Sequence, residues 1–265
     1  MQSFNYAKPA SLADAAAALA KAEDGTLLAG GQTLLPTMKA RLAAPSDLVD
    51  LAGIAELKGI SVSGGTVTIG AMTRHADVAG SAEVKGAIPA LAALAGGIGD
   101  QAVRNRGTIG GSVANNDPAA DYPAAVLGLG ATVRTNSRSI AADDFFTGLF
   151  DTALNAGEIV TAVSFPVPQK AAYVKFPNPA SRYAMVGVFV AKTASGVRVA
   201  VTGAGNGGVF RVPAYEAALA ANFSPSAIAD GVISAADMNS DLHADAEYRA
   251  HLVAVMARRA VAAAG

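Results

Sequence analysis

The sequence predicts an α+β protein, with two N-terminal lobes followed by a smaller α+β C-terminal domain. A strand, a glycine pair, a helix and a second strand follow one another in residues 26–51. From Glu158 onward the pattern changes to alternating strands, and the chain closes on a long helical segment. We therefore expect domains over residues 1–167, with lobes of about 1–55 and 56–167, and over 168–265, divided in the segment PVPQK.

The first lobe is predicted to begin with a capped helix. Ser11 precedes Asp14 and a run of alanines, and Gly25 is expected to end that helix. The segment TLLAGGQTLLPTMKARLAAPSDLVDL then predicts a strand, a Gly-Gly turn, a helix that starts near Pro36 or is broken by it, and a strand ending at Leu51.

The middle lobe is predicted to alternate strands and short helices. GGTVTIG indicates a hairpin-like strand that leads to a helix capped by Thr73, and AIPALAALAGG a further helix. Residues 104–125, RNRGTIGGSVANNDPAADYPAA, start like a strand and end like a helix start. The helix PAADYPAAVLGLG and the strand ATVRT follow.

The C-terminal part is predicted to hold strands of period two and a terminal helix. The strand segments, from Glu158 on, are EIVTAVSFPV, AAYVKF, YAMVGVFVAKT and VRVAVTG. The helix AEYRAHLVAVMARRAVAAA carries Arg258 and Arg259 in its latter half, where the helix dipole favours cations.

Composition narrows the possible functions. The net charge is −1 and no cluster of Lys and Arg appears, so nucleic acid is not an expected partner. The 265 residues contain no cysteine, and the three histidines have no zinc spacing, so no metal site is expected. Charged residues interrupt every apolar run and no signal-peptide pattern opens the chain, so we expect no membrane span and a cytoplasmic location.

One glycine motif is a poor candidate for cofactor binding. GAGNGG, residues 203–208, matches the GxGxxG pattern after a strand. A dinucleotide loop of the Rossmann type must open a helix, however, and here VFRVP follows with Pro213 at its end. We interpret this stretch as a strand connection.

Two other glycine loops are better candidates for a phosphate site. In LAGGQTLLP, Gly30 and Gly31 allow backbone amides near Gln32 and Thr33 to face an anion. GTIGGS offers the same arrangement at residues 107–112. Either loop alone is also compatible with an ordinary tight turn, but two of them without a nearby lysine suit a diphosphate that stays bound. Since redox work without cysteine needs an organic cofactor, FAD is favoured over NAD.

The same segments carry a family resemblance. AGGQTLLPTMKARL, TIGAMTRH, VRNRGTIGGSVANNDPAADYPAA and AEYRAHLVAVMARRAV resemble the FAD-binding medium subunit of molybdenum hydroxylases, the carbon monoxide dehydrogenase and xanthine dehydrogenase family. The likeness covers nearly the whole chain. It implies a two-lobed FAD-binding domain of the vanillyl-alcohol-oxidase (PCMH) type and the family's C-terminal domain.

The resemblance also implies a set of cofactor contacts and no catalytic side chain. Lys175 in YVKF lies near a lysine that contacts flavin in relatives, and Tyr183 would pack against the isoalloxazine or, alternatively, only cap the core. Ser112 replaces the asparagine usual at its position. Arg104 and Arg106 match a basic patch before the TIGG loop, for which a catalytic role stays as open as a solvated or cofactor-flanking one. The expected FAD-binding residues are Ala29, Gly30, Gly31, Gln32, Thr33, Leu34, Thr108, Gly110, Gly111, Ser112, Asp121, Lys175 and Tyr183.

The implied activity is an electron relay. A large partner subunit would hold the molybdenum cofactor and oxidise an aldehyde, CO or an N-heterocycle, and a small partner would carry [2Fe-2S] clusters. FAD in this chain would pass the electrons to an external acceptor, in a heterotrimer or a dimer of heterotrimers. Two alternatives stay open at this point: a standalone flavin oxidoreductase, for which His75 is the one histidine near a glycine loop, and an assembly subunit without FAD.

Overall fold

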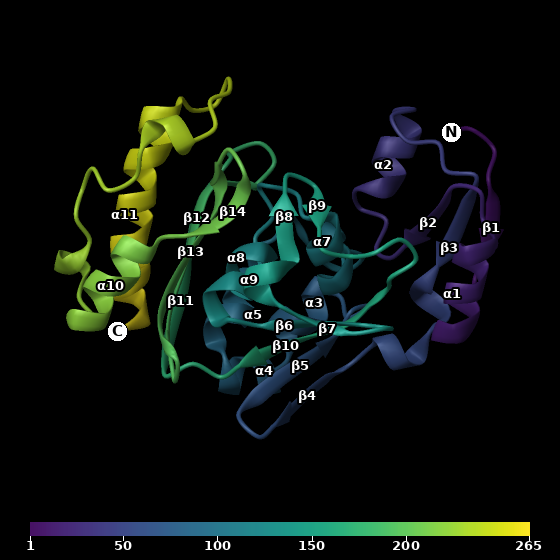
Figure 1. Ribbon diagram of the computed structural model, residues 1–265, viewed down its shortest axis with the longest axis horizontal. Helices are drawn as coiled ribbons and strands as arrows, with labels where there is room; N and C mark the ends of the chain where they lie inside the picture. Colours follow the sequence, from purple (N-terminus) through teal and green to yellow (C-terminus); the bar gives the residue numbers. More distant parts are fainter.

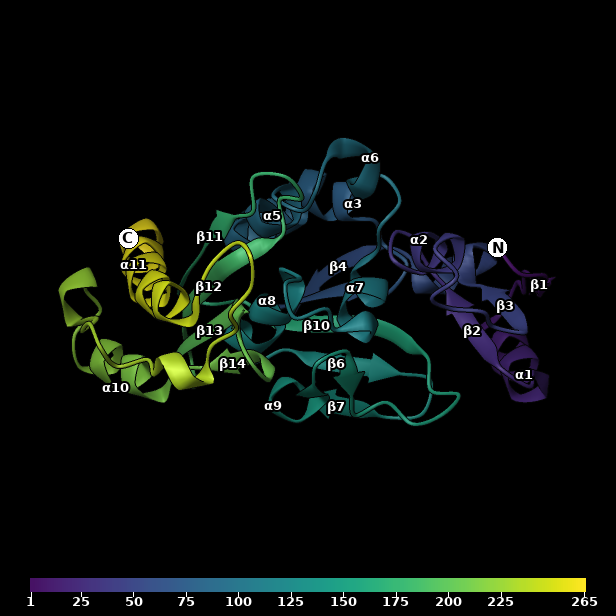
Figure 2. The ribbon, with the colours of Figure 1, turned by 90° about the horizontal axis from the view of Figure 1, so that it is seen from above.

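The computed structural model describes residues 1–265 and divides them among three regions along the longest axis of the molecule (Figure 1). The purple N-terminal lobe and the yellow C-terminal region lie at opposite ends, and the teal middle lobe lies between them. Figure 2 shows the same order from above. The predicted α+β class is confirmed, with strands and helices in every region.

The first lobe is a small parallel sheet with two helices. Its strand order is β1-β3-β2, and both pairings are parallel. Ser11 caps the first helix as expected, but that helix ends at Lys21. Gly25 instead opens the next strand, where a Cβ atom would lie 2.7 Å from that of Ala22. The elements are β1 Asn5–Ala7, α1 Leu12–Lys21, β2 Gly25–Leu28, α2 Leu34–Lys39 and β3 Asp47–Asp50.

The middle lobe is built on an antiparallel sheet of order β4-β5-β10-β6-β7. Strand β10, from beyond Glu158, joins this sheet centrally, and Gly64 and Gly65 turn the β4–β5 hairpin with positive φ. The strands are β4 Ile60–Ser63, β5 Thr66–Gly70, β6 Thr132–Thr135, β7 Ser139–Ala141, β8 Phe146–Gly148, β9 Asp151–Thr152 and β10 Val160–Pro166. The helices are α3 His75–Gly80, α4 Ala82–Ala87, α5 Pro89–Gly96, α6 Gln101–Arg104, α7 Ile109–Asn115, α8 Tyr122–Leu129 and α9 Ala142–Phe145.

Two local predictions for the middle lobe are wrong. Arg74, and not Thr73, is the N-cap of α3, because the Thr73 hydroxyl donates to the carbonyl of Gly59 and accepts from its amide. The segment from Arg104 does not start as a strand. Arg104 ends α6, and Thr108 is the N-cap of α7, where its hydroxyl accepts from the Gly111 amide at 3.2 Å.

The C-terminal region is an antiparallel sheet, β11-β12-β13-β14, lying between helices on both faces. Val186, Val188 and Val190 face the terminal helix, whereas Phe189 and Ala191 pack toward α8. Strand β12 is therefore apolar on both faces. The elements are β11 Lys170–Pro177, β12 Ala184–Thr193, β13 Gly196–Gly205, β14 Gly208–Arg211, α10 Pro213–Ala221 and α11 Ala246–Ala264.

The cores of the three regions differ in size. The middle lobe, with the inner face of the C-terminal sheet, forms a cluster of 30 buried apolar residues. The outer face of that sheet and α11 form a second cluster of 19. The third cluster, at the first lobe, has 7 residues, of which Leu57, Met72 and Ile159 come from the middle lobe. None of the helices combines the length and the hydropathy that crossing a bilayer requires.

Candidate cofactor-binding site

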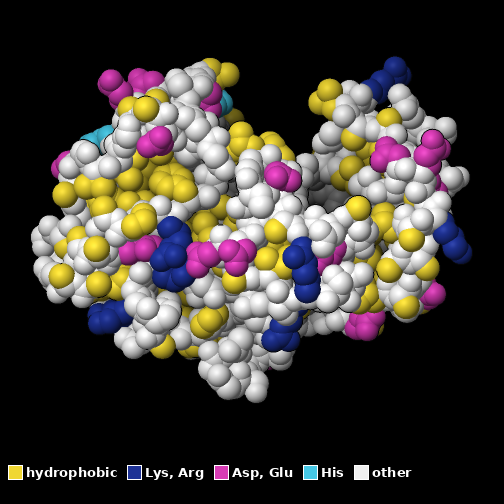
Figure 3. Space-filling view, viewed as in Figure 1, with side chains coloured by type: hydrophobic (Ala, Val, Ile, Leu, Met, Phe, Trp, Pro, Cys, Tyr) yellow, Lys and Arg dark blue, Asp and Glu magenta, His cyan; other side chains and the backbone are white.

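A cavity of about 670 Å³ lies between the first lobe and the middle lobe, within the range of small-molecule and cofactor sites. Figure 3 shows the surface hollowed between these two parts of the molecule. Both glycine loops line the cavity, as do segments near residues 157–160 and 181–183. All the predicted cofactor residues except Lys175 line it: Ala29, Gly30, Gly31, Gln32, Thr33, Leu34, Thr108, Gly110, Gly111, Ser112, Asp121 and Tyr183.

The first glycine loop presents free backbone donors to the cavity. It connects β2 to α2, and Gly31 has φ +71°, a value that glycine adopts without strain. The amides of residues 30–34 donate to no acceptor within the chain, and Thr33 makes no side-chain capping bond to α2. Such a run of unpaired amides suits an anion with several oxygens.

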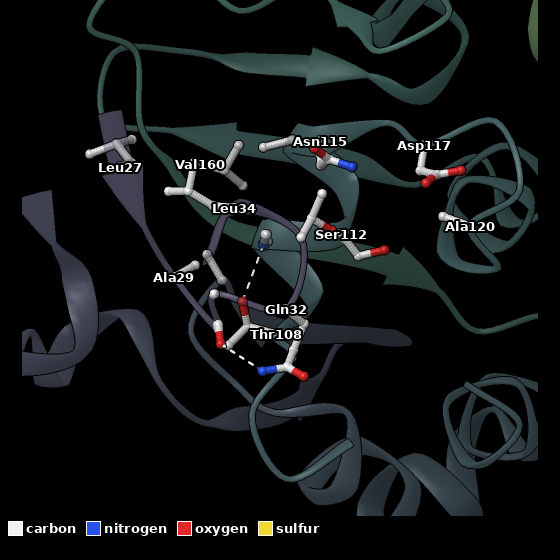
Figure 4. Close-up of a pocket in the computed structure, with 18 of the residues that line it drawn as sticks. Leu27, Ala29, Gln32, Leu34, Thr108, Ser112, Asn115, Asp117, Ala120 and Val160 are labelled. Carbon is white, nitrogen blue, oxygen red and sulfur yellow. Dashed lines mark hydrogen bonds between the residues drawn. The ribbon is translucent and has the colours of Figure 1, made fainter. Parts of the chain in front are cut away.

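The second glycine loop is arranged differently from the prediction. Its glycines lie in the first turn of α7, and the Gly110 amide donates to the Ala71 carbonyl at 2.9 Å. The amides of Gly111 and Ser112 donate to the hydroxyl and the carbonyl of Thr108. Gly110 and Gly111 therefore do not form an outward amide nest. The Ser112 hydroxyl has no partner within the chain and lies toward the cavity (Figure 4).

The two loops touch each other through backbone atoms. A Cβ atom on Gly30 would lie 2.3 Å from the Arg106 carbonyl oxygen, and one on Gly111 would lie 3.3 Å from the Cβ of Ala29. Glycine is therefore needed at position 30 to bring the lobes this close. The same contact shows how Arg106 takes part in the site: through its main chain.

One end of the cavity is apolar. Leu27, Leu51, Ile159 and Val160 line it, and Figure 4 shows Leu27 and Val160 on the far side of the loops from Asp117. The neighbouring Glu158 is held by Arg138 at 3.0 Å and by the amide of Asn155. These bonds lower the pKa of Glu158 to about 2. The sequence does not predict the 157–160 segment as part of the site, since Gly157 and Glu158 form no recognisable binding motif.

The other end carries acids and an aromatic ring. Burial raises the pKa of Asp117. Burial also raises the pKa of Asp121, although Lys175 and Tyr173 stabilise the charged form of that carboxyl group. Tyr183 is 46% exposed and lines this end with Ser181 and Arg182. The cavity thus has an apolar end, a central glycine section with amides and hydroxyls, and a polar end with an aromatic face.

Three other residues that the sequence analysis singled out lie outside the two glycine loops. The Lys175 ammonium is 3.1 Å from the Asp121 carboxylate, behind the cavity wall. The Arg104 guanidinium donates to the carbonyls of Ile98 and Gly99, so it binds the loop between α5 and α6. His75 lines the cavity, but burial lowers its pKa to about 4 and its Nδ1 atom has no partner.

The motif GAGNGG is a strand connection, as expected. It spans the end of β13 and the turn into β14, and the helix that follows begins only at Pro213. It lines no part of the cavity. No group of three or more His, Cys, Asp or Glu side chains is placed to hold a metal ion.

Comparison with known proteins decides the family. Residues 2–168 match the family described as FAD binding domain in molybdopterin dehydrogenase. The nicotine 6-hydroxylase medium subunit of Paenarthrobacter nicotinovorans is 37% identical over 279 residues, covering 100% of this chain and 98% of the relative. The chain belongs to the FAD-binding medium subunits of molybdenum hydroxylases.

Other medium subunits extend the match over the whole fold. The carbon monoxide dehydrogenase medium chain of Afipia carboxidovorans is 38% identical over 98% of this chain and 96% of its own. A solved structure of carbon monoxide dehydrogenase from Hydrogenophaga pseudoflava matches with a TM-score of 0.92 and 36% identity, covering 99% of this chain and 97% of that one. The predicted family and fold are confirmed.

The residues present in this medium subunit fit FAD. The central glycine section supplies unpaired amides where a pyrophosphate needs donors, and each end of the cavity offers apolar or aromatic side chains against which a planar ring system can pack. Glycine at position 30 lets the two loops that line the cavity meet without a side chain between them.

Proposed function

We propose that FAD binds across the cavity with its pyrophosphate on the amides of residues 30–34. The unpaired amides are the observation that carries this assignment. The hydroxyls of Thr33, Thr108 and Ser112 add donors from both loops. The adenosine would lie at the apolar end, and the isoalloxazine at the end of Tyr183 and Asp121.

The proposed activity is an electron relay inside a larger complex. Bound FAD would supply reversible two-electron and one-electron redox chemistry, which no side chain of this cysteine-free protein can provide. The electrons would come from [2Fe-2S] clusters of a small partner subunit and leave to an external acceptor. A large molybdenum-binding partner would oxidise the substrate, an aldehyde, CO or an N-heterocycle. Relatives named as medium chains or subunits support a heterotrimer or a dimer of heterotrimers.

The chain's own residues hold the cofactor and shape its surroundings. The loop glycines let the backbone approach the phosphates, and Leu27, Leu51 and Val160 exclude water at one end. At the other end Tyr183 offers an aromatic face, while Asp121 places an acceptor beside it. No side chain needs to move a proton to substrate in this scheme, because substrate is bound elsewhere.

We also propose the domain division and the location of the protein. Residues 1–167 would form the FAD-binding domain and 168–265 the C-terminal domain. The gap between β10, which ends at Pro166, and β11, which begins at Lys170, supports this division. A cytoplasmic location fits the absence of a helix able to span a membrane.

The test is the flavin content of the purified chain and of one variant. We expect about one FAD per chain, released on heating. Gly111→Val should lose it, because the valine methyl groups would occupy the space between Thr108 Oγ1 and Ala29. Gly207→Ala is the matched control in GAGNGG, since no atom lies within 4 Å of its added Cβ.

Each outcome bears on the assignment. A colourless wild-type chain that also refuses added FAD would overturn it, and full flavin content in Gly111→Val would contradict the two-loop site. Gly205→Ala is a worse control than Gly207→Ala, because its Cβ would lie 2.7 Å from the Phe210 ring and strain the hairpin.

A further inference from the structure

The strongest unexplained feature beside the cavity is the ammonium group of Lys175. It lies on β11, its side chain is 11% exposed, and it does not line the cavity. Its Nζ atom donates to the Gly97 carbonyl at 2.9 Å, to the Asp121 carboxylate at 3.1 Å and to the Arg182 carbonyl at 2.9 Å. An ammonium has three hydrogens, so none remains for a cofactor.

The three acceptors belong to three different segments around the polar end of the cavity. Gly97 follows α5, Asp121 precedes α8, and Arg182 is the next-to-last residue of the loop between β11 and β12. Asp121 is itself fixed by a short hydrogen bond from the Tyr173 hydroxyl. Lys175 therefore joins the wall of the cavity to the loop that carries its aromatic residue.

That loop is held in an unusual conformation. Arg182 has φ +63°, in the left-handed region that side chains other than glycine rarely adopt. Asn178 is 8% exposed, and its side-chain oxygen accepts from the backbone amides of Ala180 and Ser181. The backbone amide of Asn178 donates to the Tyr183 carbonyl. These bonds close the loop on itself. The Arg182 amide donates to the Asn178 carbonyl and its guanidinium to the Gly99 carbonyl at 3.4 Å, while the Lys175 ammonium is the group that binds its carbonyl.

We propose that Lys175 is a positioning residue for Tyr183 and contributes to FAD binding through the Arg182 carbonyl, without contacting the cofactor. The ammonium holds Arg182 in its strained conformation, and Arg182 sets the direction in which the next residue, Tyr183, enters the cavity. This inference rests on the proposed function. It replaces the sequence-based expectation that Lys175 touches the flavin.

A double-mutant cycle on FAD affinity tests this proposal, with Lys175→Met and Tyr183→Ala as its two changes. If Lys175 acts through Tyr183, Lys175→Met should raise the Kd for FAD about tenfold in the wild-type background and leave it unchanged in the Tyr183→Ala background. Flavin fluorescence gives a second readout, because a tyrosine packed on the flavin quenches it. Lys175→Met should raise the fluorescence of bound FAD toward the Tyr183→Ala value.

Two further variants guard against a folding defect. Lys175→Met leaves Asp121 buried without its cation, so the cycle is repeated with Lys175→Met/Asp121→Asn, which removes the unpaired charge. Lys192→Met is the matched control, because Lys192 lies on the neighbouring strand, is exposed and has no side-chain partner. It should change neither Kd nor fluorescence.

The outcomes separate the two proposals. An equal loss of affinity in both Tyr183 backgrounds would mean that Lys175 acts on FAD binding independently of Tyr183 and would overturn the positioning role. Unchanged Kd and fluorescence in Lys175→Met would overturn it as well. A wild-type chain that binds no FAD would overturn the proposed function first, and this inference with it.

Discussion

The two glycine loops look alike in sequence and differ in what they offer a ligand. Each has a Gly-Gly pair followed within two residues by a hydroxyl side chain. In the first loop the amides of residues 30–34 are unpaired, whereas in the second Gly110, Gly111 and Ser112 all donate within the chain. A glycine pair thus leaves backbone donors unpaired in one lobe and allows close packing in the other, where Gly110 lies against Ala71.

The largest expected effect is a difference in the free energy of unfolding between glycine-to-alanine variants of the two loops. Gly110→Ala would place a Cβ 2.5 Å from that of Ala71, so we expect the free energy of unfolding to fall by about 3 kcal/mol. Gly31→Ala should cost about 1 kcal/mol, mainly through its positive φ, since its nearest contact is the flexible end of Leu35. Urea denaturation of both variants measures the difference. Equal losses would contradict the division into a binding loop and a packing loop.

Lowering the pH should destabilise the protein through protonation of His75. This residue is 5% exposed and its pKa is lowered to about 4 from 6.5, so the unfolded chain binds the proton more readily between these pH values. Stability from the neutral imidazole is present above pH 6.5 and is lost as the pH falls toward 4, by about 3 kcal/mol.

Denaturation of wild type and His75→Gln at pH 7.5 and pH 4 checks this expectation. The variant should lose less stability than wild type on acidification. His243→Gln, at an exposed histidine, is the control and should behave as wild type does. An identical loss in all three proteins would show that His75 is not the titrating group.

The smallest effect compares the same substitution at two N-cap positions. Thr108 caps α7 with a hydrogen bond to Gly111, and Thr33 precedes α2 without one. Thr108→Val should therefore lower the free energy of unfolding by about 1 kcal/mol, whereas Thr33→Val should leave it unchanged. Thermal unfolding of the FAD-free proteins measures this. A larger loss in Thr33→Val would reverse the roles assigned to the loops.

The sequence predicts those parts of the structure that neighbouring residues determine better than those that depend on contacts between distant segments. The Gly-Gly turn between β2 and α2, the terminal helix and the strand connection at GAGNGG follow from glycine, proline and periodicity, and the structure contains all three. The prediction for the amides of the second loop is wrong, because the Gly110 amide donates to Ala71, far away in the chain, and those of Gly111 and Ser112 donate to Thr108 at the N-cap of α7.

The hydrogen bonds that shape the polar end of the cavity cannot be predicted from the sequence for the same reason. Arg182 adopts a positive φ without being glycine, and no local pattern announces it. Lys175 meets Gly97 and Asp121 only after the C-terminal sheet packs on α5 and α8. The resemblance pointed to Lys175, and the structure shows which atoms it binds.

The buried apolar cluster at the first lobe has only 7 residues, 4 of them from residues 1–55, against 30 in the cluster that the middle lobe forms with the inner face of the C-terminal sheet. The main cavity-facing loop of the first lobe is also the part of the site with unsatisfied donors. A ligand that binds only the native state at one hundred times its Kd adds about 2.7 kcal/mol, a large share of what so small a core provides. Cofactor occupancy is thus coupled to local opening: the parallel sheet of the first lobe should exchange its amide hydrogens fastest in the apoprotein and gain the most protection when FAD is restored.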